Sequence, residues 1–209
     1  MTKDDNRIIK SMRDYLYDND MNVIDAMKIS EGTGIPFSKL IEIAPTPRDL
    51  VRKVFAYEII EFAAIFDEYH FEEQNAIDVL IIVGQEVYKK FHDVNPAVSY
   101  HLKSLYPDLY YEHLDNKIDF MVEHVINNLK KGQNQGIYKE RLDVDELRNK
   151  LIKNIAKVHD HEILSSGQLT FAIVFNEVIE NFIRESTDND WWSYYKQRKQ
   201  LFEALDFNR

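Results

Sequence analysis

Apolar residues recur every three or four positions along most of the chain, which is the spacing of an amphipathic helix. No stretch alternates apolar and polar residues as a half-buried strand does. Helix breakers are scarce, with only 6 Gly and 5 Pro among 209 residues, so few positions interrupt a helix. The sequence therefore predicts an all-α fold, of a length that suits one large domain or a small domain joined to a larger one.

The N-terminal stretch divides into three short helices. An amphipathic pattern covers residues 6–19, and Asp25 is placed to cap a second helix. Gly32 and Gly34 end that helix, because glycine accepts the left-handed backbone of a helix C-terminus. Pro36 suits the first turn of a third helix. Three short helices with a tight turn between the second and the third form a helix-turn-helix pattern.

A fourth helix begins immediately after this pattern. Thr46 is placed as its N-cap, Pro47 as its first residue, and Asp49 as the acidic partner of a capping box. The helix that follows is long and apolar over much of its girth. We therefore place a helix-turn-helix domain at residues 1–50 and a larger helical domain at residues 51–209.

The larger domain continues as helices with short connections. Its polar loop is expected at residues 132–139, and the segment LTFAIVFNEVIENFI is apolar nearly all round at its start. Such a helix must be covered on two sides, one by its own core and the other by a partner chain. The predicted helices cover 76–91, 96–105, 107–131, a segment capped by Asp143 or Asp145, and two C-terminal segments.

The net charge of −10 is unevenly distributed. Residues 1–53 contain nine basic and nine acidic residues, so the whole acidic excess follows them. A less acidic head on an acidic body is oriented toward phosphate, although a neutral head is poor for binding DNA. No apolar run approaches the roughly 20 residues that span a bilayer, and MTKDDNRIIK lacks the apolar core of a signal peptide. We expect a cytoplasmic protein.

Signatures of catalysis and of metal binding are missing from the sequence. It contains no Cys, which excludes thiolate catalysis and zinc–thiolate sites, and no G-x-S-x-G, phosphate loop or dinucleotide fingerprint. His159 and His161 are two positions apart, so a helix would point them to different sides. We expect neither an enzyme nor a cofactor or metal site.

The N-terminal pattern resembles that of the TetR/AcrR family of bacterial transcription regulators. The stretch FHDVNPAVSYHLKSLYPDLYYEH, followed by NNLKKGQNQGIYKERLDVDEL, is similar to the ligand-binding half of certain members. The resemblance covers nearly the whole chain and needs no gap across residues 7–51. Its N-terminal positions are Arg7-Ile8-Ile9, Leu16, Asp25, Ile29-Ser30, Gly34-Ile35, Leu40, Thr46 and Asp49-Leu50.

The resemblance implies a TetR-like DNA-binding head on a helical body that dimerises and encloses a small, mostly hydrophobic ligand. The DNA-binding residues implied are Phe37, Ser38, Lys39, Glu42, Thr46, Arg48 and Lys53. Aromatic residues on the helices around the family's cavity suggest a ligand site, with a filled core as the alternative: Phe62, Phe66, Tyr88, Phe91, Tyr100, Phe120 and His124. The expected homodimer interface contains Leu169, Phe171, Val174, Phe175, Val178 and Phe182.

Departures from the family pattern fall where DNA contact is expected. Ile41, Ile43 and Pro47 replace two tyrosines and a lysine that touch phosphates in the family, and Glu42 would be repelled by a phosphate. Phosphate contacts supply most of the non-specific affinity for DNA. Two functions therefore stay open: a ligand-responsive regulator that binds an operator, or a TetR-fold dimer that binds a ligand or protein and has lost DNA binding.

Overall fold

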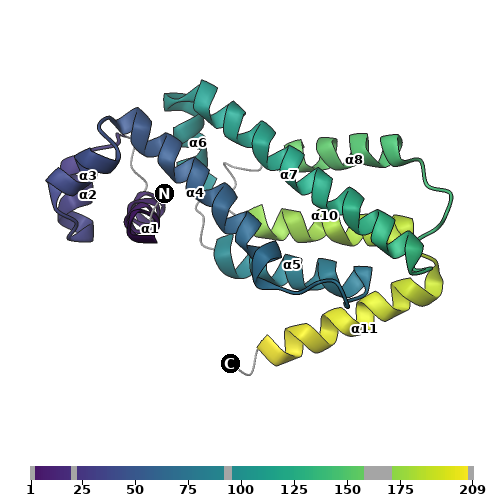
Figure 1. Ribbon diagram of the computed structural model, residues 1–209. Helices are drawn as coiled ribbons and strands as arrows, with labels where there is room; N and C mark the ends of the chain where they lie inside the picture. Colours follow the sequence, from purple (N-terminus) through teal and green to yellow (C-terminus); the bar gives the residue numbers. More distant parts are fainter. Residues whose placement is uncertain (1–2, 20–22, 92–95, 158–170, 207–209) are drawn as a thin grey trace. The chain divides into compact units, whose positions relative to one another are not determined.

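The structure is a computed structural model that describes residues 3–19, 23–91, 96–157 and 171–206. Within these ranges the side chains of residues 3, 96–100, 157, 171–175 and 202–206 are not described. The described part of the chain is all-α, apart from an isolated bridge between Tyr138 and Thr187. Its helices are α1 Lys3–Asp18, α2 Ala26–Thr33, α3 Phe37–Ile43, α4 Pro47–Glu68, α5 Ala76–Phe91, α6 Pro96–Leu105, α7 Pro107–Asn134, α8 Val144–Lys157, α10 Phe171–Ser186 and α11 Asn189–Asp206 (Figure 1).

Backbone contacts divide the chain into two compact units. Of the described residues, the first unit takes α1, α2, α3 and α6 together with α4 up to residue 64 and α7 up to residue 117. The second unit takes the remainder of α4 and α7 together with α5, α8, α10 and α11. A separate domain at residues 1–50 stays a prediction.

The helix-turn-helix has the expected caps. Asp25 accepts hydrogen bonds from the backbone N–H of Met27, at 2.8 Å, and of Lys28, at 3.4 Å. Gly34 follows α2 with φ of 69°, in the left-handed region that glycine favours. α1 packs on α2, and α2 on α3. The tight turn predicted between the second and third helices is therefore present.

Two details of this region differ from the sequence prediction. Gly32 lies inside α2 rather than at its end, and a Cβ atom there would lie 1.9 Å from Cε2 of Tyr15 on α1. The glycine therefore allows close contact between two helices, and Gly34 alone ends the helix. Pro36 is the N-cap of α3, one position before the first turn.

The start of α4 is the capping box that the sequence indicates. The Thr46 hydroxyl accepts from the backbone N–H of Asp49 at 3.1 Å and donates to the Asp49 carboxylate at 2.7 Å. Buried side chains of the first unit come from the apolar stripe of α1 and from α2, α3 and α4. They include Ile9, Met12, Leu16, Ile29, Leu40, Leu50, Val51 and Val54.

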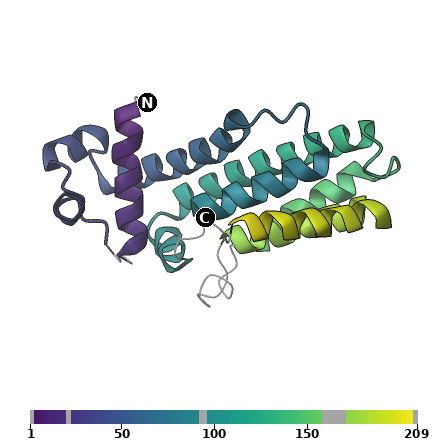
Figure 2. The same cartoon turned by 90° about the horizontal axis from the view of Figure 1, so that it is seen from below.

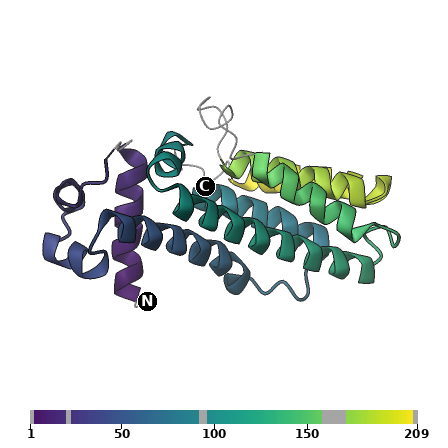
Figure 3. The ribbon, with the colours of Figure 1, turned by 90° about the horizontal axis from the view of Figure 1, so that it is seen from above.

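α5 is the most buried helix of the second unit, and it contacts both α10 and α11 (Figure 2). α10 also contacts α8 (Figure 3). The polar loop expected at residues 132–139 is only partly correct, because α7 continues to Asn134 and both Ile137 and Tyr138 are buried. The Tyr138 hydroxyl donates to the Asn128 side chain at 2.9 Å. None of the described helices is long and apolar enough to span a bilayer.

Candidate functional site

α3 presents a mixed apolar and polar surface to solvent. Leu40 points inward and is 1 % exposed, whereas Phe37 is 41 % exposed and Ser38 and Glu42 are also exposed. Lys39 is the basic residue of this helix, and its ammonium lies 3.0 Å from the Glu42 carboxylate. The outward surface of α3 therefore combines an aromatic ring, a hydroxyl group and one ion pair whose charges cancel.

The basic residues at the start of α4 also have acidic partners. Arg48 donates two hydrogen bonds to the Asp108 carboxylate at the start of α7 and thereby holds the pKa of Asp108 below its usual range. Arg52 pairs with Asp49 at 2.9 Å. Lys53 is half-buried. The predicted DNA-binding residues therefore lie on α3 and at the start of α4, where Thr46 takes part in the cap and Arg48 is paired with a carboxylate.

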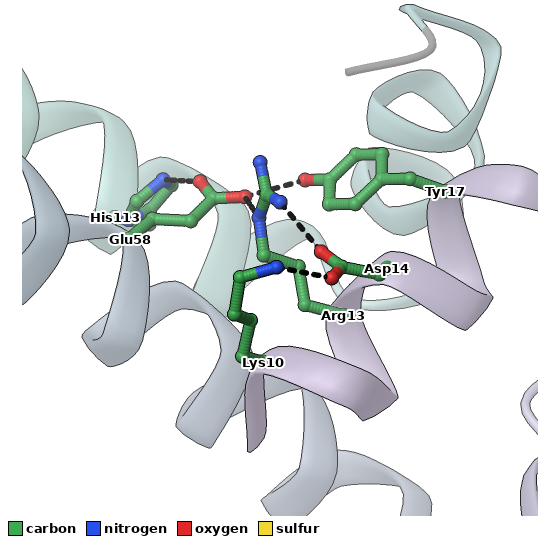
Figure 4. Close-up of polar contacts among 6 residues, drawn as sticks. All are labelled: Lys10, Arg13, Asp14, Tyr17, Glu58 and His113. Carbon is green, nitrogen blue, oxygen red and sulfur yellow. Dashed lines mark hydrogen bonds and ion pairs between the residues drawn. The ribbon is translucent and has the colours of Figure 1, made fainter. Parts of the chain in front are cut away.

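A buried polar cluster lies behind the helix-turn-helix in the same unit (Figure 4). Its centre is Glu58 of α4, only 5 % exposed in a helix whose neighbouring residues are mostly apolar. The surrounding polar side chains are each less than 9 % exposed: Arg13 and Tyr17 of α1, and His113 and Lys117 of α7.

The two carboxylate oxygens of Glu58 contact different helices. Oε1 accepts a 2.8 Å hydrogen bond from the Tyr17 hydroxyl and lies 3.5 Å from Nε of Arg13, both on α1. Oε2 lies 3.1 Å from Nε2 of His113 on α7. Because an ionised carboxylate only accepts hydrogen bonds, this histidine nitrogen carries the hydrogen. One side chain of α4 therefore bridges α1 and α7.

The cluster shifts the pKa values of its members. Burial alone would raise the pKa of Glu58, but the hydrogen bond from His113 and the charges of Lys117 and Arg13 outweigh burial and hold this pKa well below its usual range. Burial lowers the pKa of Lys117 to about 8 against the opposing pull of Glu58. At neutral pH the cluster therefore contains a buried carboxylate between buried cations.

Side chains around the cluster hold its members in place. The Phe55 ring stacks on His113 with centroids 4.3 Å apart and planes 4° apart. On the solvent side, Asp14 accepts hydrogen bonds from Arg13 at 2.9 Å and from Lys10 at 2.6 Å (Figure 4). Sequence reasoning missed this site, although Glu58, one of two glutamates in the otherwise apolar run FAYEIIEF, was a signal for it.

Several predicted ligand-binding residues meet in the second unit. The Phe66 ring lies 3.7 Å from the His124 ring and 5.9 Å from the Phe120 ring, measured between centroids. Burial lowers the pKa of His124, with Glu123 acting in the opposite direction. Three of the seven predicted residues therefore form one aromatic–imidazole cluster, and each of the three is half-exposed.

The other predicted ligand-binding residues differ in their exposure and in the unit to which they belong. Phe91 is 2 % exposed and lies in the core of the second unit, while Tyr88 is 49 % exposed and lies at the surface. Phe62 is 2 % exposed and belongs to the first unit. The side chain of Tyr100, on α6, lies outside the described residues.

The predicted dimer interface is described only in part. Val178 and Phe182 are 5 % and 2 % exposed in the single chain, because α10 packs on α5 and α8. These two residues are therefore buried within the single chain, and their assignment to a dimer interface stays a prediction. The remaining four fall outside the described side chains: Leu169, Phe171, Val174 and Phe175.

Across the ranges that the structure describes, no three His, Asp or Glu side chains are grouped so as to hold a metal ion. His159 and His161 lie outside those ranges.

Comparison with known proteins adds one structural likeness. No family model matches the sequence, and no curated protein matches it. Among solved structures, the chain is similar to the ketosteroid transcriptional regulator KstR2 of Mycobacterium tuberculosis, with a TM-score of 0.49 and 14 % identity over 90 % of this chain and 97 % of that chain. At this level of similarity, the support for a function has to come from the residues described above.

Proposed function

We propose that the chain is a TetR-type transcriptional regulator, a cytoplasmic homodimer that binds operator DNA and responds to a small hydrophobic ligand. The observation that carries the proposal is the helix-turn-helix: α2 capped by Asp25, a left-handed Gly34, and α3 with Phe37 and Ser38 exposed. In this motif the second helix enters the major groove and reads base edges near its N-terminus.

The exposed surface of α3 favours an unusual readout of DNA. Phe37 matches the 5-methyl group of thymine, Ser38 can bond to several base edges, and Glu42 can accept from the amino group of cytosine. Replacing thymine by uracil in a bound site removes only the methyl group. We expect this replacement to weaken binding at one base position, and we expect Phe37→Ala to abolish the difference between the two sites.

Phosphate contacts would come from Lys39, Arg48, Arg52 and Lys53. The first three must leave or share their carboxylate partners to reach a phosphate. The Lys39–Glu42 pair is exposed, and such pairs contribute about 0.2–1 kcal/mol, so a phosphate can compete for the lysine. If all four cations on both heads of a dimer contact phosphates, the slope of log affinity against log salt concentration is about −7, which is its steepest expected value.

Titration of DNA at several salt concentrations tests the proposal. The sites are first selected from a random library and from the DNA that flanks the gene. We expect binding at low salt with a slope shallower than the limit above, and weaker binding by Lys39→Ala. Absence of any complex at low salt would reject DNA binding.

The second candidate function is a TetR-fold dimer that binds a ligand or a protein but not DNA. Its specific support is that Lys39, Arg48 and Arg52 already have carboxylate partners within the chain. The low-salt titration distinguishes the two candidates. A ligand site in the second unit would be common to both, and the cluster of Phe66, Phe120 and His124 is its best-supported part.

A further inference from the structure

Glu58 connects α1 to α4 and α7 through buried polar contacts. Its Oε1 faces Tyr17 and Arg13 of α1, and its Oε2 faces His113 of α7 (Figure 4). Arg13 and Tyr17 are one helical turn apart, so both sit on the side of α1 that faces α4. A carboxylate held from two sides permits fewer relative positions of two helices than an apolar contact does, because hydrogen bonds are directional.

The position of α1 in turn determines the position of the helix-turn-helix. α1 packs on α2, and α2 packs on α3. The α1–α2 contact is close, since the Tyr15 ring occupies the space where a Cβ atom of residue 32 would lie. A movement of α1 relative to α4 would therefore move α2 and α3 with it.

We propose that Glu58 is a positioning residue for the helix-turn-helix, which holds α1 against α4 and α7 and so fixes how α3 is presented. The expected effect on DNA binding rests on the proposed function. The docking of α1 itself does not depend on DNA, so it is tested without it.

The histidine side of the bridge is also held by aromatic contacts. The His113 ring lies flat against Phe55 of α4, and Tyr110 packs edge-on against the same Phe55 ring at 6.4 Å. The Oε2–His113 contact therefore links α4 and α7 through two kinds of interaction. On the α1 side, Oε1 contacts Tyr17 and Arg13, and we expect a weakened bridge to release this side more than the α7 side.

Amide hydrogen exchange on the full chain tests this assignment. Tyr17→Phe removes the hydroxyl that bonds to Oε1 and leaves the ring in place, while Glu58→Gln removes the charge and keeps the shape. The matched control is Glu180→Gln, because Glu180 also accepts from a tyrosine and a cation, Tyr195 and Lys199, but lies in the second unit. A second control, Ile183→Val, lowers global stability from the core of the second unit.

We expect Tyr17→Phe to raise exchange in α1 about tenfold, the effect of losing one buried hydrogen bond, with a smaller rise in α7. Glu58→Gln should raise exchange in both helices. Neither control should change α1 selectively. If DNA binding is found, Tyr17→Phe should weaken it more than Ile183→Val does at equal global stability.

Unchanged α1 exchange in Tyr17→Phe would overturn the positioning role, as would an α1 effect of the same size in Ile183→Val. Should Glu58→Gln fail to fold, Tyr17→Phe decides the question alone. If the chain does not bind DNA but Tyr17→Phe still raises exchange selectively in α1, the proposed function is rejected and the role of Glu58 is kept.

Discussion

Among the described residues, each unit contains one buried carboxylate that joins helices, Glu58 in the first and Asp78 in the second, and the two are stabilised in different ways. Asp78 of the second unit lies in the first turn of α5, next to Asn75, which caps the helix. It accepts from the Tyr194 hydroxyl at 2.9 Å and from Nε of Arg198 at 3.0 Å, both on α11. Glu58 lies well inside α4 and away from a helix N-terminus.

The difference lies in what would stabilise each charge if a partner were lost. Asp78 keeps the favourable field of a helix N-terminus, and its partner Arg198 is 35 % exposed, so water can approach the pair. Glu58 has only side-chain partners, and Arg13 and His113 have side chains less than 9 % exposed. We therefore expect the α11 contact to tolerate the loss of a partner better than the α1–α4–α7 cluster does.

The largest expected effect is that of Glu58→Ala. Removal of the carboxylate leaves the charges of Arg13 and Lys117 buried without it, and breaking a buried ion pair typically costs about 3–5 kcal/mol of unfolding free energy. Urea denaturation of this variant and of Asp78→Ala gives the comparison. An equal or larger loss in Asp78→Ala would contradict the distinction between the two carboxylates.

The next effect is a dependence of stability on pH that comes from Lys117. Its pKa is about 8 in the folded chain against an ordinary value of 10.5, so between these values the unfolded chain binds more protons. Stability should therefore rise with pH from about 8, by a few kcal/mol at most, since one pKa unit corresponds to about 1.4 kcal/mol.

The free energy of unfolding should be measured between pH 8 and about 9.5 to detect this rise. Above about pH 10 the rise is opposed by Tyr57, Tyr110 and Tyr138, because burial raises the pKa of each and folding then loses stability with pH. The groups whose charges act on Lys117 are Glu58 of α4 and Arg13 of α1. Lys117→Met should flatten the profile in this window, and a slope that persists in the variant would assign it to another group.

A smaller effect is expected at Asp78. Asp78→Asn keeps the shape and one acceptor oxygen but weakens the bonds from Tyr194 and Arg198, at a cost of about 1–2 kcal/mol. Exchange should increase in α11 and stay unchanged in α1. A loss as large as that of Glu58→Ala would show that the helix N-terminus does not protect this charge.

The smallest effect is expected at the exposed pair on α3. Glu42→Gln removes the partner of Lys39, and because both side chains reach solvent, the stability should change by less than about 1 kcal/mol. The same variant frees the lysine for phosphate, so any DNA affinity should increase. Lower affinity after Glu42→Gln would indicate that Glu42 itself contacts DNA.

The helices could be predicted from sequence because their signals are local. Apolar spacing and the caps at Asp25 and Thr46 act within a few residues, and α5 was located at both of its ends. The helix-turn-helix follows from the same signals. The all-α class is therefore confirmed for the described part of the chain, while the ligand, the operator and the dimer stay predictions.

The buried cluster could not be predicted, because it joins residues that are far apart in the sequence. Glu58 and Tyr17 are separated by 41 positions, and Glu58 and His113 by 55. Periodicity gives the apolar face of each helix but not the helix that covers it. For the same reason, the sequence does not show that Arg48 pairs with Asp108, which lies 60 positions away.

The contact of Tyr15 with Gly32 has a consequence for natural variation. Since the ring lies where any larger residue at position 32 would place its first carbon, the two positions share one volume. Homologues that carry alanine or serine at 32 should compensate with a slimmer side chain at 15, or separate their first two helices. Paired substitutions at positions 15 and 32 across related genomes would thus indicate that the first two helices keep their close contact.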